Sequence, residues 1–146
     1  MENIGRDVIT GVWELLAFED RESEAESWNP TFGQDPRGVV VYHPSGLLSV
    51  QVLAGSGDAW APYLGYVGRW SLREISLTAD GAEGVVEHRM ESASMLELLD
   101  EDPARPFVVA GDELVLGDSR TYRRIFRRPL PPDAQQRSRD IRTHWE

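Results

Sequence analysis

The chain has 146 residues, and its 25 acidic residues outnumber its 15 basic residues to give a formal net charge of −10. The length suits one domain of ordinary size, and the acidic balance argues against nucleic acid and anionic membrane surfaces as partners. The absence of cysteine excludes disulfides, thiolate nucleophiles and zinc ribbons. All 15 basic residues are arginine, which excludes lysine Schiff-base chemistry and indicates a GC-rich bacterial genome.

The sequence predicts neither secretion nor membrane insertion. It begins MENIGRDVITGVWELL, which lacks the basic segment and continuous apolar core of a signal peptide. No apolar run approaches the roughly 18 residues that a membrane span needs. The expectation is a soluble, cytoplasmic protein.

Apolar residues recur in short runs separated by Gly, Pro, Asp and Ser, a pattern typical of strands and tight turns. The runs predicted to be strands are residues 9–18, 38–43, 47–53, 65–77, 84–91, 106–110, 113–117 and 120–128. The turn at residues 43–46 contains Pro followed by Gly two residues later, which favours a hairpin. Because open sheet edges aggregate, consecutive hairpins predict an all-β, closed antiparallel up-and-down β-barrel of about eight strands.

Three segments interrupt the strand pattern. Residues 19–36 form a long acidic connection that we expect to act as a lid, and residues 56–64 and 93–102 are expected to hold short helical turns. The predicted domain is residues 1–128. Residues 129–146 are a Pro-led, Arg-rich tail that is expected to pack on the barrel.

Alternation along each strand assigns side chains to the interior. In residues 84–91 it places His88 inside, and in residues 65–77 it places Tyr66 and Trp70 inside. In the last strand Arg124 shares the face of the neighbouring aromatic residues. A buried guanidinium can stack on an indole, so we expect Arg124 to cover Trp13 at the closed end as a structural pair.

Five segments resemble, in order, the bacterial and fungal lipocalin-like domain family of the calycin type. They are Gly11-Val12-Trp13, residues 32–52 (FGQDPRGVVVYHPSGLLSVQV), residues 63–70 (YLGYVGRW), residues 86–92 (VEHRMES) and residues 121–124 (TYRR). The chain departs from the family pattern at Phe32, where the family has Pro, at Tyr122, where it has Trp, and throughout residues 93–105. The resemblance implies a lipocalin-like barrel and does not name a reaction.

The predicted interior suggests a small-molecule site. His88 and Tyr66 are the candidate catalytic pair, because a cavity imidazole can transfer protons near neutral pH. A core histidine hydrogen-bonded to a tyrosine or a backbone carbonyl is the commoner explanation for such a position, and between the two functional roles the sequence favours ligand contact over catalysis. The candidate ligand-binding residues are Trp28, Phe32, Tyr42, Gln51, Trp60, Tyr63, Tyr66, Trp70, His88 and Met90. The residues between 19 and 36 and between 56 and 64 are expected to flank the open end, with their aromatic side chains covering the ligand.

Three functions are compatible with this sequence. The first is a carrier or metabolite-binding protein whose barrel encloses a small, mostly apolar molecule. The second is a cofactor-free cyclase, isomerase or dehydratase of bacterial secondary metabolism that acts on a polyketide-like substrate with a cavity His and Tyr. The third is a filled barrel that acts as an interaction module. No cofactor or metal is expected, since the three histidines do not have ligand spacing, and the protein is expected to be a monomer or homodimer.

Overall fold

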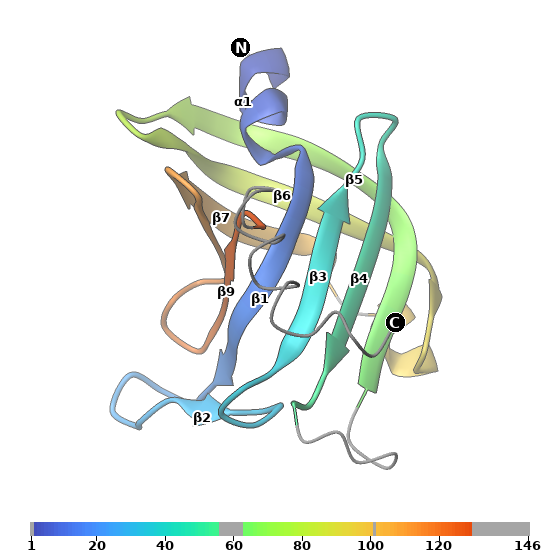
Figure 1. Cartoon of the computed structure of the whole chain (residues 1–146), viewed down its shortest axis with the longest axis vertical. Helices are drawn as coiled ribbons and strands as arrows, with labels where there is room; N and C mark the ends of the chain where they lie inside the picture. Colours follow the sequence, from blue (N-terminus) through green and yellow to red (C-terminus); the bar gives the residue numbers. More distant parts are fainter. Residues whose placement is uncertain (1, 56–62, 101, 130–146) are drawn as a thin grey trace, which may run out of the picture.

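The predicted closed antiparallel barrel is confirmed by a computed structural model, which describes residues 2–55, 63–100 and 102–129 (Figure 1). Eight strands close the barrel and one short strand is added to it. The helical elements are α1 (Glu2–Ile9) and the 3-10 helix η1 (Leu96–Asp100). The strands are β1 (Gly11–Asp20), β2 (Asn29–Pro30), β3 (Arg37–Tyr42), β4 (Leu47–Leu53), β5 (Tyr63–Leu77), β6 (Gly81–Ala93), β7 (Ala104–Ala110), β8 (Glu113–Leu116) and β9 (Tyr122–Arg127).

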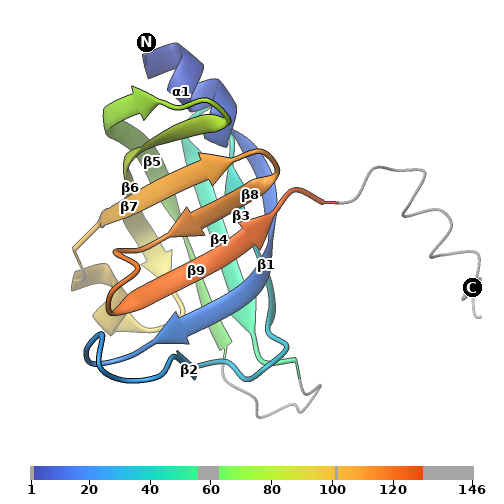
Figure 2. The same ribbon diagram turned by 90° about the vertical axis from the view of Figure 1, so that its left-hand side faces the viewer.

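Strand β1 closes the barrel by pairing with two other strands. Its first half pairs with β3, and its second half pairs with β9, so these two strands lie on either side of it (Figure 2). A bulge between Leu15 and Ala17 shifts the register of the β1–β9 pair. A bulge increases local twist and bends the strand. It therefore suits the position at which β1 stops pairing with β3 and continues along β9.

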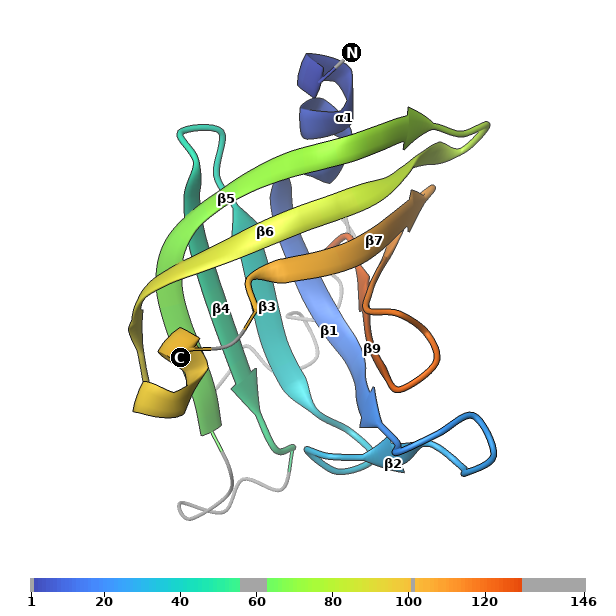
Figure 3. The ribbon, with the colours of Figure 1, turned by 180° about the vertical axis from the view of Figure 1, so that it is seen from behind.

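The remaining strands follow one another as a meander, as the turn pattern predicts. Strands β5 and β6 are the longest, with 15 and 13 residues, and they curve together around the back of the barrel (Figure 3). The short strand β2 pairs with the end of β1 and lies in the connection of residues 19–36. The helical turn expected in residues 93–102 is present as η1.

The interior is divided into a packed half and a hollow half. The packed half lies toward α1 and is filled by large buried side chains, which are Ile9, Trp13, Tyr42, Leu48, Trp70, Val86, Phe107, Val109 and Leu114. Further along the same strands, the inward positions line a cavity. Helix α1 and β2 lie at opposite ends of the barrel (Figure 1), so the cavity opens at the β2 end.

The predicted stack of Arg124 on Trp13 is wrong, because Arg128 occupies that position. The Arg128 guanidinium lies 3.8 Å from the centre of the Trp13 ring and donates hydrogen bonds to the carbonyls of Thr10 and Val8. In the β1–β9 register Arg124 pairs with Phe18, and its guanidinium lies 3.5 Å from the centre of that ring. Trp13 is fully buried, as expected of a structural residue.

Helix α1 is a feature that the sequence pattern did not predict. It packs against β5 and β6, where Arg6 lies 4.2 Å from the centre of the Trp70 ring and donates to the carbonyl of Pro44. No helix in the described part of the chain has the length and apolar character required to span a membrane. The expected packing of residues 129–146 on the barrel falls, except for Pro129, outside the described residues.

Candidate functional site

The hollow half of the barrel contains a cavity of about 960 Å³. The apolar part of its wall consists of the aliphatic side chains of Val40, Val50, Val52, Leu64, Met90, Leu98 and Leu116 and the aromatic rings of Phe18 and Phe126. The volume lies within the range of about 300–1,000 Å³ that is usual for small-molecule sites, and such sites combine an apolar wall with a few placed polar groups. The polar groups of this cavity gather at its inner end and at its mouth.

His88 lies at the inner end, where the cavity meets the packed half of the barrel. Its ring is 2% exposed and lies between two tyrosine hydroxyls. Nε2 is 2.7 Å from the Tyr42 hydroxyl, and Nδ1 is 2.8 Å from the Tyr66 hydroxyl. Tyr42 is fully buried, whereas Tyr66 lines the cavity. The three side chains therefore form a hydrogen-bonded chain that leads from the core to the cavity.

This chain of hydrogen bonds crosses the inside of the barrel. Tyr42 ends β3 and His88 lies in β6, and two other strands separate β3 from β6 in the sheet. Alternation predicts that both side chains point inward, and the closed sheet brings them together. The Tyr42 ring also packs edge-on against Trp70 at 5.2 Å, which fixes it against the packed half.

Burial determines the protonation of these groups. Burial, followed by the positive charge of Arg105, lowers the pKa of His88 from 6.5 to about 3. Burial, followed by the neighbouring Tyr66, raises the pKa of Tyr42 well above 10 against the opposing effect of Arg105. At neutral pH the imidazole is therefore uncharged, and Tyr42 keeps its proton.

Arg105 is a cavity residue that the sequence analysis did not single out. It begins β7, lines the cavity and shares the inward face of Phe107 and Val109. Its guanidinium donates to the carbonyls of Asp102 and Ala104, and its charge acts on the pKa of His88. The cavity therefore combines a tyrosine hydroxyl and a neutral imidazole at its inner end with the Arg105 side chain in its wall.

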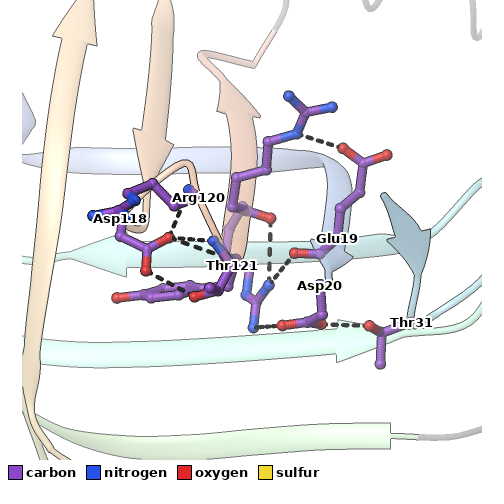
Figure 4. Close-up of polar contacts among 9 residues, drawn as sticks. Glu19, Asp20, Thr31, Asp118, Arg120 and Thr121 are labelled. Carbon is purple, nitrogen blue, oxygen red and sulfur yellow. Dashed lines mark hydrogen bonds and ion pairs between the residues drawn. The ribbon is translucent and has the colours of Figure 1, made fainter. Parts of the chain in front are cut away.

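The mouth of the cavity is held together by the turn between β8 and β9. The Asp118 carboxylate accepts hydrogen bonds from the backbone nitrogens of Arg120, Thr121 and Tyr122 and from the Thr121 hydroxyl (Figure 4). Partial burial raises the pKa of Asp118, but the hydrogen bonds from Thr121 and its neighbours outweigh this effect and lower the pKa well below its usual range. The turn is therefore organised around one ionised carboxylate.

The end of β1 is tied to the same region. Arg124 donates to the carbonyl of Glu19 at 2.8 Å and to the Asp20 carboxylate at 3.1 Å, and the other Asp20 oxygen accepts the hydroxyl of Thr31 (Figure 4). Asp20, Arg124 and the neighbouring Tyr122 line the cavity. One side of the mouth thus carries a half-buried ion pair that is held between β1 and β9.

Trp28 lies in the connection of residues 19–36, outside the cavity wall. Its ring is held between two guanidiniums, with Arg21 at 3.9 Å and Arg123 at 4.4 Å from the ring centre. Arg21 also donates to the carbonyl of Arg120, so this segment is fastened to the β8–β9 turn. The same connection contributes Arg21, Glu22, Glu26, Ser27 and Asn29 to the rim of the cavity.

The structure divides the candidate ligand-binding residues into groups. Tyr66, His88 and Met90 line the cavity, and Tyr42 and Trp70 lie in the packed half behind it. Gln51 and Tyr63 instead pair with each other on the outer face, since Gln51 alternates with the inward Val50 and Val52 and Tyr63 is 47% exposed. Phe32 packs edge-on against Phe18 and borders a smaller surface pocket. Trp60 lies outside the described residues.

Within residues 2–55, 63–100 and 102–129, no three His, Asp or Glu side chains form a group that could hold a metal ion. Comparison of the chain with family models, with curated proteins and with solved structures finds no match.

Proposed function

We propose that this protein is a lipocalin-like barrel that binds a small, mostly apolar molecule in its cavity. The cavity of about 960 Å³ carries the proposal, because it combines an apolar wall with polar residues at its inner end and at its mouth. Apolar side chains that face a cavity lack packing contacts on that side. A bound apolar molecule would restore those contacts.

The state of His88 supports binding over proton transfer. A general base works best when its pKa lies near the working pH, whereas burial holds the pKa of His88 at about 3. Both ring nitrogens are also engaged by tyrosine hydroxyls. The cavity itself weakens the alternative of a filled barrel that acts only as an interaction module.

The proposal is tested with N-phenyl-1-naphthylamine, an uncharged apolar dye whose fluorescence increases when it leaves water. We expect saturable binding of about one dye per chain. Val52 lines the cavity and is 1% exposed, so Val52→Trp should fill the site and weaken dye binding at least tenfold. Val67 is 42% exposed on the outer face of β5, and Val67→Trp is the matched control that should bind as wild type does.

Melting curves of both variants exclude unfolding as the cause of a lost signal. The proposal is wrong if folded wild-type protein shows no saturable binding. It is equally wrong if Val52→Trp binds the dye as tightly as Val67→Trp does, because the dye would then bind outside the cavity.

A further inference from the structure

The outer side of the barrel has an apolar face that runs across β1, β3, β4 and β5. Val12, Val41, Ser49 and Val67 follow one another across these four strands, because each is the register partner of the next. The buried residues that alternate with them point into the barrel, so this row points outward. Val12 and Val67 are each 42% exposed. The row is therefore an apolar band on the outside of the barrel, interrupted by one small hydroxyl.

Two further rows extend this face toward the mouth of the barrel, on strands that lie side by side in Figure 1. Val39 pairs with Gln51 and Gln51 with Gly65, and in the following row Leu53 pairs with Tyr63. The Tyr63 hydroxyl donates to Gln51, and its phenol lies over Gly65, where a side chain would collide with it. The tyrosine thus lies along the sheet. We call these three rows the outer apolar face.

The central strand of this face has a sequence that is typical of a strand covered on both sides. Val39, Val40 and Val41 follow one another in β3, which lies between β1 and β4. Val40 is fully buried in the interior, and the other two point outward. An antiparallel strand with one side in water usually alternates apolar and polar residues, whereas a continuous apolar run favours burial on both sides. The sequence of β3 therefore indicates that another surface covers this face.

The size of the outer apolar face suits the centre of a weak protein interface. Four strands about 4.8 Å apart and three rows about 6.7 Å apart cover an area on the order of 400 Å². A standard interface buries about 800 Å² on each partner and has an apolar centre inside a polar rim. The face is about half of that area, so we expect a reversible association in which the rim takes part.

The rim carries balanced charge, in contrast to the net charge of −10 of the whole chain. The charged side chains next to the three rows on these strands are Glu14, Arg37 and Arg69. Glu14 pairs with Arg127 at 3.7 Å and Arg69 pairs with Glu91 at 3.8 Å, both as exposed ion pairs. A strongly charged partner would find no complementary charge here, whereas two acidic copies of the chain repel each other least at such a face.

We propose that the outer apolar face binds the same face of a second copy of this chain and forms a weak two-fold dimer. Glu14 and Arg69 lie on the opposite edges of the face, on β1 and β5. A two-fold axis between the copies can therefore place the Glu14 edge of each copy against the Arg69 edge of the other. The dimer face is separate from the cavity, because its side chains point out of the barrel.

Sedimentation velocity of the full chain tests this proposal between about 1 μM and about 1 mM, the range of weak association. We expect dimers to form reversibly as the concentration increases. Raising the NaCl concentration from about 0.1 M to about 1 M shortens the screening length from about 10 Å to about 3 Å, which weakens the repulsion between the acidic copies. The dimer should therefore tighten with salt, and a dimer that salt weakens would contradict an apolar interface.

Two matched substitutions locate the interface. Val67→Arg places a positive charge in the face of both copies and should weaken the dimer at least tenfold, since like charges oppose association. Val108 is 44% exposed on the outer side of β7, so Val108→Arg is the control that should dimerise as wild type does. Melting curves establish that the variants are folded, and Ser49→Arg, in the same row, replaces Val67→Arg if that variant unfolds.

Wild-type protein that stays monomeric at about 1 mM would overturn the proposal. In such a monomer, a nuclear Overhauser contact between the Val67 methyl groups and the Trp145 indole would assign the face to residues 130–146 of the same chain instead. A dimer that is as tight in Val67→Arg and Ser49→Arg as in Val108→Arg would also overturn the proposal, because the copies would then meet elsewhere.

Discussion

The buried imidazole of His88 should make the stability of this protein depend on pH below neutrality. The pKa of His88 is about 3 in the folded protein and 6.5 in an unfolded chain. Between these values the unfolded chain binds a proton that the folded protein does not, so acid favours unfolding and stability falls as pH decreases. From pH 7 to pH 5 this single group should lower the free energy of unfolding by about 2 kcal/mol.

Urea unfolding at several pH values measures this effect, with His88→Gln as the reference. The variant also loses stability at pH 7, because Tyr42 and Tyr66 lose their partner, but its curve should be flatter between pH 7 and pH 5. Comparison of the two curves cancels contributions from carboxylates and from the overall negative charge. Parallel curves would contradict the assignment of a neutral, buried His88.

A second measurement does not depend on the variant being folded. In the wild-type protein the NMR signals of the His88 ring should not titrate between pH 8 and pH 5, and the carbon shifts should be those of an imidazole with its proton on Nδ1. A ring that titrates near pH 6.5 in the folded protein would refute the argument. A proton on Nε2 would contradict a donor role of the buried Tyr42 hydroxyl toward His88, while leaving the pH dependence of stability unchanged.

Two further predictions concern the ends of the barrel. Arg128→Met removes the guanidinium over Trp13 and its two backbone hydrogen bonds. The change should lower the free energy of unfolding by about 2–3 kcal/mol and shift the NMR signal of the Trp13 indole. The control variant Arg124→Met should leave that signal in place. Equal shifts in both variants would contradict the observed register. Asp118→Ala removes four hydrogen bonds to one carboxylate at the mouth. It should lower the free energy of unfolding by about 1–3 kcal/mol and speed amide hydrogen exchange in the β8–β9 turn. Unchanged exchange in that turn would show that the carboxylate does not organise it.

The sequence predicts most of this fold because its strand signals are local. Short apolar runs, turn residues and alternation depend on neighbouring residues, and they place eight strands and the inward positions of His88, Tyr66 and Arg124. The same alternation places Gln51 outside, between Val50 and Val52. Its assignment to the cavity came from its chemistry, and the pattern of the strand contradicts it.

The partner of Trp13 shows where local patterns are insufficient. Arg124 and Arg128 have the same parity in the strand predicted over residues 120–128, so alternation gives both the same face, although β9 itself ends at Arg127. Register decides between them, and the register of β1 against β9 includes a bulge after Leu15. A single sequence contains no signal for that bulge, because it depends on how the barrel closes.

Arg105 could have been found from the sequence. It alternates with the inward Phe107 and Val109, but the apolar run predicts a strand that begins only at residue 106, whereas β7 begins at Ala104. The contact between Tyr42 and His88 could not have been found in this way. The two residues are 46 positions apart in the chain and meet across the interior, so their contact follows from closure of the whole sheet.

The position of His88 also explains why structural and ligand-contact roles do not exclude each other at this residue. An apolar side chain at this position would remove the hydrogen-bond partner that the hydroxyls of Tyr42 and Tyr66 share. Each lost hydrogen bond would lower the free energy of unfolding. A neutral imidazole meets both, because it accepts at one nitrogen and donates at the other. The bond to Tyr42 lies in the packed half of the barrel, and the bond to Tyr66 lies at the inner end of the cavity. A change that removes the imidazole should therefore lower the free energy of unfolding, because both hydroxyls lose this partner.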